Sequence, residues 1–300
     1  MLKADLHLHT TCSDGEYSPQ GAVKAAAEAG FQLMAVTDHD TIVGIEEALR
    51  AGEKAGITVI PGVEVTLRFK RPRFTGSLHV LLYFTEELFR NAAFQRDIMS
   101  TVSRGRGPGL VKSRVKAIND VFGPRGSTPL LKRELTADEI LSLAPNVSRR
   151  HFAQALAANH DLSRDQVSRL IGNDSPAYIP SGIEMESLAK FISRYPVLPV
   201  LAHPAAGSYP GESHYSEVLP SLEVVEGMLP EFLAMGLRGL EVYYPGHTDE
   251  HVQHLLALAK KLGLVVTGGS DCHDAEKRPL LQPGAVGDVS EFLELLKTLE

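Results

Sequence analysis

The chain has 300 residues, 43% of them hydrophobic and 22% charged, which is enough apolar material to bury a sizeable core in one β/α barrel or in two average domains. Its formal net charge of -7 at pH 7 excludes a broad basic surface for long nucleic acid, although metal ions and a few arginines could still hold a small anionic substrate. No apolar run reaches the roughly 20 residues of a membrane span, and the first residues lack a secretory-signal pattern, so we expect a soluble, cytoplasmic protein without membrane partners.

Short apolar runs of strand length alternate with amphipathic stretches of helix length, which is typical of βαβ units in a parallel sheet. A first helix is expected to begin at Ser18 and Pro19, an N-cap followed by proline at the first helical position, and to end at Gly30. A second helix runs from about Val43 to near Gly56. The seven predicted strands are 3–7, 33–37, 58–65, 78–84, 197–202, 239–243 and 264–268. We therefore predict an α/β fold with a seven-stranded sheet.

The alternation of strands and helices stops between the fourth and fifth predicted strands. Thr136 and Ser163 are each followed three residues later by Glu or Gln, and these capping-box patterns open short amphipathic segments. We therefore predict a helical subdomain inserted at 86–184, acting as a substrate lid, on a barrel formed by 1–85 and 185–300.

Histidines and acidic residues gather at or just beyond the ends of the predicted strands. His7 and His9 are two residues apart, so both point to the same side of a strand, and Asp271 and His273 repeat this arrangement. In parallel barrels the C-terminal strand ends converge on one pocket. A single histidine there would be an ordinary core residue, but nine ionisable groups without partners would be costly to bury. We therefore predict a metal site built from His7, His9, Asp14, His39, Glu64, His79, His203, Asp271 and His273.

The candidate ligands are imidazole nitrogens and carboxylate oxygens, a mixture that suits manganese, iron or zinc better than calcium or a thiolate zinc centre. We predict two or three divalent ions, which would share a bridging water, lower its pKa and provide the resulting hydroxide as a nucleophile. Asp14 and His39 would serve catalysis through these ions, and Asp38 is expected to orient a ligand or the nucleophile. Cys12 and Cys272 are expected to be reduced, unpaired thiols.

Five groups of residues resemble, in chain order, the motifs of the PHP (polymerase and histidinol phosphatase) superfamily. The resemblance covers about 1–85 and 190–285 and implies a distorted seven-stranded (β/α)7 barrel with a trinuclear metal site. The motifs are Asp5-Leu-His-Leu-His-Thr with Ser13-Asp14-Gly15, Thr37-Asp-His-Asp40, Pro61-Gly-Val-Glu64, Ala202-His-Pro204 and Gly269-Ser-Asp-Cys-His273.

The resemblance also implies how the ligands divide among three ions. One ion would take His7, His9, Glu64 and Asp271. A second would take Asp14, His39 and His203, and a third His79 and His273 with Glu64 bridging.

The predicted insert is similar to one branch of that superfamily, which hydrolyses nucleoside 3′,5′-bisphosphates and trims short RNA from its 5′ end. Ser148-Arg-Arg-His-Phe-Ala-Gln-Ala-Leu156 resembles its GRPHxARAL stretch, and Ala177-Tyr-Ile-Pro180 its AYVP stretch. Glu241-Val-Tyr-Tyr244 followed by His247 also fits. Arg150 stands where that pattern has proline, whereas Arg149 and His151 remain in register. The resemblance thus implies a hydrolase acting on a small nucleotide or a short 5′-phosphorylated oligonucleotide.

Several residues are candidates for holding the substrate. Arg149 is the first, because its planar guanidinium can donate two parallel hydrogen bonds to one phosphoryl group, and His151 lies beside it. His247 would donate to phosphate or protonate the leaving oxygen, unless it is an ordinary loop histidine. Arg104 and Arg106 lie among glycines whose amides could approach a phosphate, unless this segment is solvated.

A second basic run, at 68–73, is expected to be solvated loop charge. Two other functions stay open: a histidinol-phosphate or other small phosphomonoesterase, which the nucleotide-branch insert disfavours, and a metal-binding regulatory protein with no open coordination position. A polymerase proofreading module is disfavoured because the chain ends soon after the last motif. Nothing in the sequence specifies an oligomeric state.

Overall fold

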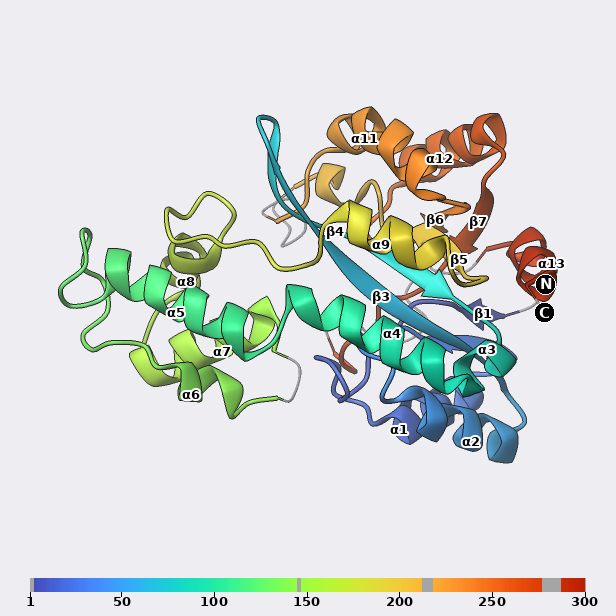
Figure 1. Cartoon of the computed structure of the whole chain (residues 1–300), viewed down its shortest axis with the longest axis horizontal. Coiled ribbons are helices and arrows are strands. Elements are labelled where there is room, and N and C mark those ends of the chain that lie inside the picture. The colour runs from blue at the N-terminus through green and yellow to red at the C-terminus, as the bar shows by residue number, and fades with distance from the viewer. Residues whose placement is uncertain (1–2, 145–146, 212–217, 277–286, 300) are drawn as a thin grey trace.

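The computed structural model describes residues 3–144, 147–211, 218–276 and 287–299, and a seven-stranded sheet forms its centre (Figure 1). The strands lie in the sheet in chain order. Short strands such as Leu-Met-Ala-Val and Leu-Pro-Val-Leu are buried along their whole length, as expected for strands covered on both faces. The strands are β1 (Ala4–Asp5), β2 (Leu33–Val36), β3 (Thr58–Arg71), β4 (Phe74–Tyr83), β5 (Leu198–Leu201), β6 (Gly239–Tyr243) and β7 (Val265–Gly268).

The sheet curls until its last strand meets its first. The Leu6 N–H donates to the Gly268 carbonyl at 3.1 Å, and Leu8 pairs with Cys272 in a parallel bridge. The result is a nearly closed α/β barrel of seven strands, which confirms the predicted fold class.

The fourth strand departs from the predicted parallel arrangement. Within the described sheet, β4 alone runs antiparallel to both neighbours, β3 and β5. Only two residues separate β3 from β4, and so short a connection permits only antiparallel pairing. β3 extends past its predicted end and β4 begins before its predicted start, so residues 68–71 belong to β3 rather than to a solvated loop.

Helices cover the outside of the barrel. The first, α1 (Pro19–Glu28), begins as predicted, because the Ser18 hydroxyl caps it by accepting from the Gly21 N–H. The second, α2 (Ile45–Ala55), ends at Gly56, whose φ of 71° suits a residue without a side chain. The other covering segments are α3 (Glu86–Arg90), α4 (Ala92–Val102), η1 (Ser103–Gly105), α9 (Met185–Ile192), η2 (Ala206–Ser208), α11 (Leu222–Met235) and α12 (Asp249–Leu262).

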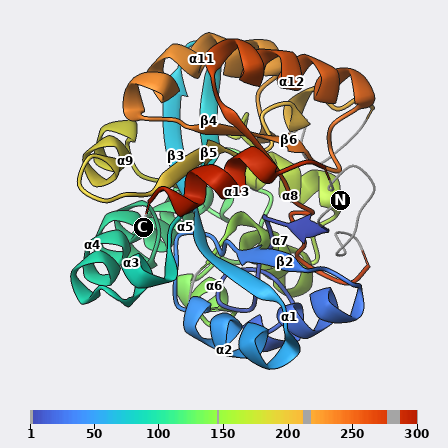
Figure 2. The ribbon, with the colours of Figure 1, turned by 90° about the vertical axis from the view of Figure 1, so that its right-hand side faces the viewer.

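One end of the barrel is closed by the last helix, α13 (Ser290–Lys297), which crosses the barrel opening in Figure 2. Phe292 of α13 is fully buried and packs edge-on against Tyr83 of β4, with ring centroids 4.8 Å apart. This apolar plug leaves the opposite end, where all the described strands except β4 have their C-terminal ends, for polar groups.

The insert forms a lobe beside that opposite end (Figure 1). Its helices are α5 (Pro108–Phe122), α6 (Ala137–Leu141), α7 (Arg149–His160) and α8 (Arg164–Ile171). They share a hydrophobic cluster separate from that of the barrel, whereas α3 and α4, also within the predicted insert, pack into the barrel's cluster through Phe89 and Phe94. Both predicted capping boxes are present, at Thr136 and Ser163. No helix in the described ranges is long and apolar enough to cross a membrane.

Candidate metal centre

The nine predicted ligands converge at the open end of the barrel. They follow β1, β2, β5 and β7, or lie within the β3–β4 hairpin. Because β4 is antiparallel, its first half lies level with the C-terminal ends of its neighbours, and the His79 carbonyl accepts from the Ala202 N–H at 3.1 Å. His79 therefore reaches the same centre as ligands from strands that run the other way.

Glu64 on β3 lies in the middle of the histidines. Its carboxylate oxygens are 2.9 Å from His39 Nδ1, 3.1 Å from His79 Nδ1, 3.2 Å from His9 Nε2 and 3.3 Å from His203 Nε2. Only 1% of its side chain is exposed. A carboxylate shared by so many imidazoles is suited to bridge more than one cation.

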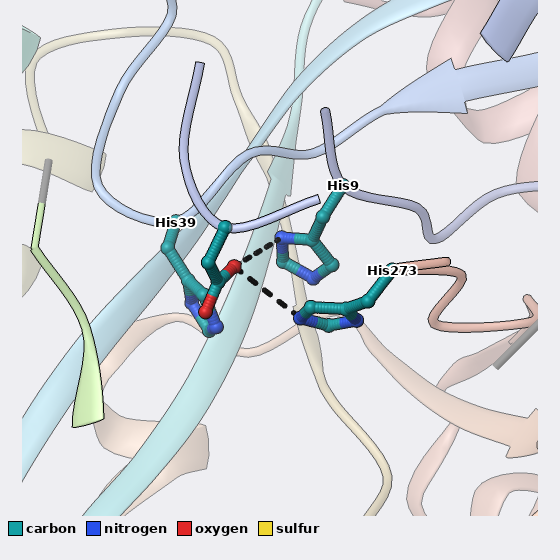
Figure 3. Close-up of side chains that lie close together, drawn as sticks. His9, His39 and His273 are labelled. Carbon is teal, nitrogen blue, oxygen red and sulfur yellow. Dashed lines mark ion pairs between the residues drawn. The ribbon is translucent and has the colours of Figure 1, made fainter. Parts of the chain in front are cut away.

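A second carboxylate, Asp14, closes the outer side of the centre. Figure 3 shows His9, His39 and His273 turned toward one carboxylate. Asp14 Oδ1 lies 3.3 Å from His273 Nε2 and 3.9 Å from His9 Nδ1. Asp271 lies deeper, with Oδ1 3.2 Å from His9 Nε2 and 3.6 Å from His7 Nε2.

The proximity of these atoms groups the ligands differently from the division that the resemblance implies. Potential ligand atoms within 4.8 Å of one another form three sets. His273 falls with Asp14 rather than with His79, and Glu64 falls with His39 and His79. The sets are His9, Asp14, His39 and His273; His7, His9 and Asp271; and His39, Glu64 and His79.

The donor set fits divalent cations. Asp14 Oδ1 and Glu64 Oε2 are buried, yet neither makes a hydrogen bond with any part of the chain that the structure describes. Nitrogens lie near both oxygens without hydrogen-bonding geometry, as expected when lone pairs point at a common centre. Burial lowers the pKa of His39 to about 4, so its imidazole is neutral, which is the form that binds a metal.

A second layer of carboxylates fixes the ligands and their loops. Glu241 on β6 accepts from His7 Nδ1 at 2.9 Å and from the His203 N–H at 2.8 Å. Asp38 accepts from Thr10 N at 2.7 Å and from Ser13 Oγ at 2.5 Å, so it holds the loop that carries Asp14. Such partners set the tautomer and direction of a metal-binding histidine.

Asp5 and Asp40 hold two other loops in the same way. Asp5 accepts from the backbone and hydroxyl of Ser270 at 2.9 and 2.6 Å, next to ligand Asp271. Asp40 accepts from the backbone and hydroxyl of Thr66 at 2.8 and 2.7 Å. Asp38 therefore takes an orienting role through a loop, and it shares that role with Asp5, Asp40 and Glu241, which belong to the quoted motifs but were assigned no role from the sequence.

The backbone around the centre is locally constrained. Asp40, His203 and Asp271 have φ values of 50°, 32° and 50°, a region that residues with side chains enter rarely and at a cost of about 1 kcal/mol or more. A β-carbon on Gly15 would lie 2.4 Å from the His9 carbonyl oxygen, and one on Gly269 would lie 2.4 Å from the His7 β-carbon. The loops at the centre depend on these two glycines.

His247 lies in a different environment from the one expected of a proton donor. Its Nδ1 donates to the Val242 carbonyl at 2.9 Å, and its Nε2 accepts from the Ala205 N–H at 3.2 Å. Burial lowers its pKa to about 4, so the ring is neutral. With both ring nitrogens bound to backbone, His247 supports the loop after His203 and does not line the cavity at the metal centre, and its role as a proton donor stays a prediction.

A cavity of about 140 Å³ lies between the metal centre and the insert. Arg149 and Arg150, in the first turn of α7, form the wall that faces the ligands. Ser77, Ser181, Val218 and Leu219 line the rest. Ser148 and Arg150 belong to the stretch that resembles the nucleotide branch, but neither was predicted to line the substrate cavity.

Arg149 is held in place on one edge and open on the other. Its Nη2 donates to Asn173 Oδ1 at 2.9 Å and to the Tyr178 hydroxyl at 2.7 Å, and its guanidinium lies 4.9 Å from the Tyr178 ring centroid. Its Nη1 is buried and has no hydrogen-bond partner among the described residues.

The other predicted substrate contacts are placed less favourably. Arg106 lines the cavity, but its guanidinium is engaged by Asp40, by the Thr66 hydroxyl at 2.9 Å and by the Val147 carbonyl at 3.4 Å. His151 Nδ1 accepts from the Ser148 N–H at 3.0 Å as part of the α7 cap. Arg104 is exposed and lines a separate hollow between α4 and α9, so the structure does not bring it to the centre.

Comparisons with known proteins agree with this geometry. A family model described as the PHP domain matches residues 5–186. The chain is 29% identical over 278 residues to a phosphoribosyl 1,2-cyclic phosphate 1,2-diphosphodiesterase of Eggerthella lenta, covering 90% of this chain and 93% of the relative. It is 28% identical to a 5′-3′ exoribonuclease of Haemophilus influenzae, covering 90% of each chain. It is 26% identical to a 3′,5′-nucleoside bisphosphate phosphatase of Chromobacterium violaceum, covering 91% and 88%.

A solved structure extends the similarity to three dimensions. A Bifidobacterium adolescentis protein described as a metal-dependent phosphoesterase superposes with a TM-score of 0.73 at 27% identity, covering 98% of this chain and 96% of that one. The family match, the named hydrolases and the convergent ligands confirm the predicted class of enzyme over a metal-binding regulatory protein. The chain belongs to the PHP family and is a metal-dependent phosphoesterase.

Proposed function

We propose that this enzyme hydrolyses nucleoside 3′,5′-bisphosphates or trims short 5′-phosphorylated oligonucleotides. The observation that carries the proposal is the cavity with metal ligands on one side and the arginine-bearing first turn of α7 on the other. A substrate with two phosphate groups can place one at the ligands and the other at the arginines. Relatives with these two activities match nearly the whole chain.

We propose that the nine ligands hold two or three divalent ions, with manganese, iron or zinc as the candidates. Such ions would lower the pKa of a water and neutralise charge on the phosphoryl oxygens. The protein orients the ligands through Glu241, Asp5, Asp38 and Asp40, and it withdraws the ligand cluster from bulk water.

Arg149 is the proposed phosphate ligand of the insert. Asn173 and Tyr178 hold one edge of its guanidinium, so little side-chain entropy remains to be lost when the buried Nη1 donates to an oxygen. The N-terminal end of α7 adds a favourable field for an anion at the same wall. These features support the insert, including its helical lobe of α5–α8, as a substrate lid.

A substrate screen on metal-reconstituted protein tests the proposal. Nucleoside 3′,5′-bisphosphates and short 5′-phosphorylated RNA should be hydrolysed faster than histidinol phosphate or simple phosphomonoesters, and chelation should abolish turnover. If histidinol phosphate is the best substrate, the chain is a small phosphomonoesterase instead.

A second candidate is hydrolysis of a five-membered cyclic phosphate of a pentose. The Eggerthella relative, named for such a substrate, has an identity and coverage similar to those of the two nucleotide enzymes. The same screen should include phosphoribosyl 1,2-cyclic phosphate, and turnover of that ester alone would select this candidate.

The Arg149→Ala variant tests the proposed phosphate contact. Loss of charge-assisted hydrogen bonds of about 1.5 to 3 kcal/mol predicts a fall of roughly 10- to 150-fold in kcat/KM on a nucleoside 3′,5′-bisphosphate. Metal content should not change, and Arg149→Lys should restore only part of the rate. The matched control is Arg104→Ala, which removes an exposed arginine from a separate hollow and should leave kcat/KM unchanged. Equal, small effects of Arg149→Ala on every ester would contradict the contact.

A further inference from the structure

Arg150 connects the insert to two loops of the barrel. It is the second residue of α7, and its own N–H is fixed by the Ser148 hydroxyl at 3.2 Å. Its Nη2 lies 3.0 Å from Glu16 Oε1 and 3.6 Å from Asp274 Oδ2, and its Nη1 donates to the Asp14 carbonyl at 3.4 Å. One guanidinium therefore touches the loop after β1 and the segment after β7.

Both of those segments carry metal ligands. The Glu16 N–H donates to the His273 carbonyl at 2.7 Å, and Asp14 Oδ1 lies 3.3 Å from His273 Nε2. Arg150 thus rests on the backbone of one ligand, Asp14, and on carboxylates beside Asp14 and His273. These two ligands belong to the set formed by His9, Asp14, His39 and His273, which is called the outer set below.

An isolated pair with Glu16 would matter little, because the Glu16 side chain is 63% exposed and exposed ion pairs contribute about 0.2- to 1-kcal/mol stabilisation. The Asp274 side chain, however, is 7% exposed, so part of the network is withdrawn from solvent. The contacts also join residues 134 positions apart in the chain. The motif that this stretch resembles has proline at this position, which could make none of these contacts.

We propose that Arg150 is a positioning residue that couples the seating of α7 on the barrel to the geometry of the outer metal set. In this arrangement Arg150 holds the Asp14 loop through its contacts with Asp14 and Glu16, while its neighbour Arg149 faces the cavity. The Arg150 side chain would then have two effects. It would slow the loss of metal from the outer set, and it would fix the distance between that set and Arg149. Only the kcat/KM measurement in the test below rests on the proposed function.

The test compares Arg150→Ala, Arg150→Lys and Glu16→Gln in the metal-loaded full chain. We expect Arg150→Ala to speed chelator-driven loss of the most labile metal by about 3- to 10-fold, a modest effect for a partner one layer removed from a ligand. Backbone amides of residues 13–16 should exchange hydrogen faster in the same variant. Arg150→Lys should recover part of both effects, and Glu16→Gln should show a smaller loss that does not add to that of Arg150→Ala.

The matched control is Arg71→Ala. Arg71 is similarly exposed and makes a long-range ion pair with Glu231 on α11, at the end of β3 seven residues beyond Glu64. Metal loss and hydrogen exchange in Arg150→Ala that equal those of Arg71→Ala would overturn the proposal. So would a loss of kcat/KM with unchanged metal retention and exchange, since Arg150 would then act on the substrate directly. If Arg150→Ala loses metal faster but the wild-type protein hydrolyses none of the nucleotides, the proposed function is overturned and the role of Arg150 is not.

Discussion

Glu64 is the side chain on which most of the histidines depend. Because its carboxylate lies within 3.4 Å of five imidazoles, Glu64→Gln replaces a shared anion by a neutral amide and should remove at least one metal ion per chain. We expect kcat to fall by about 100-fold or more, given the effect of single ligand partners on metal sites. Elemental analysis and steady-state kinetics measure both. Glu184→Gln, at an exposed carboxylate paired with Arg68, is the control and should retain metal.

Substrates with different leaving groups distinguish whether His247 acts as a general acid or only supports the loop after His203. His247→Ala leaves the Ala205 N–H and the Val242 carbonyl without partners, so we expect destabilisation of about 1 to 3 kcal/mol and a loss of activity through His203. The loss should be equal for a nucleotide and for an aryl phosphate whose leaving group needs no proton. A loss confined to the nucleotide, in a variant with unchanged Tm, would support His247 as the general acid.

At the residue scale the candidate ligands and the orienting role of Asp38 were predictable, whereas the roles of the other supporting residues were not. The two-residue spacing of His7 and His9 indicates that both side chains point to the same side of a strand. The position of the other ligands near strand ends predicts that they meet at one pocket. Glu241 sits within an apolar strand with no partner nearby in sequence, so only the fold brings it to His7. The environment of His247 is likewise decided by backbone groups, which a sequence pattern does not report.

Among the elements, the loop between β1 and α1 shapes the outer metal set. Gly15→Ala would place a β-carbon 2.4 Å from the His9 carbonyl oxygen, so the loop must shift and carry Asp14 with it. We expect destabilisation of about 1 to 3 kcal/mol and a lower metal content. Thermal unfolding and elemental analysis check this. Gly227→Ala is the control, because no atom lies within 4 Å of its β-carbon position in α11. Full metal content in Gly15→Ala would contradict the account.

The positions of the seven strands in the chain were predicted correctly, but the direction of β4 was not. Apolar runs have the same period of two in parallel and antiparallel strands, so the reversal of β4 leaves no trace in its own sequence. The signal lies in the two-residue connection at 72–73, which was obscured because charged residues extend β3 past its apolar part. The same reversal brings His79 to the centre from the first half of its strand.

Across the whole molecule, the proposed function depends on the barrel and the insert lining one cavity together. The existence of the insert follows from a break in the β/α rhythm, and its caps at Thr136 and Ser163 were readable. Its seating on the barrel was not, because contacts such as that of Asn173 with the Val218 carbonyl, at 2.7 Å, join segments with no shared pattern.

The ratio of kcat/KM for a nucleoside 3′,5′-bisphosphate to kcat/KM for the better of its two matching monophosphates, the 3′ and the 5′, tests the central claim most directly. The metal-reconstituted protein should prefer the bisphosphate by at least about tenfold, since the arginine wall supplies charge-assisted hydrogen bonds of roughly 1.5 kcal/mol or more only to the second phosphate. Activity should vanish on chelation and return with metal. Equal kcat/KM values for the two substrates, or turnover that survives complete removal of metal, would contradict the account.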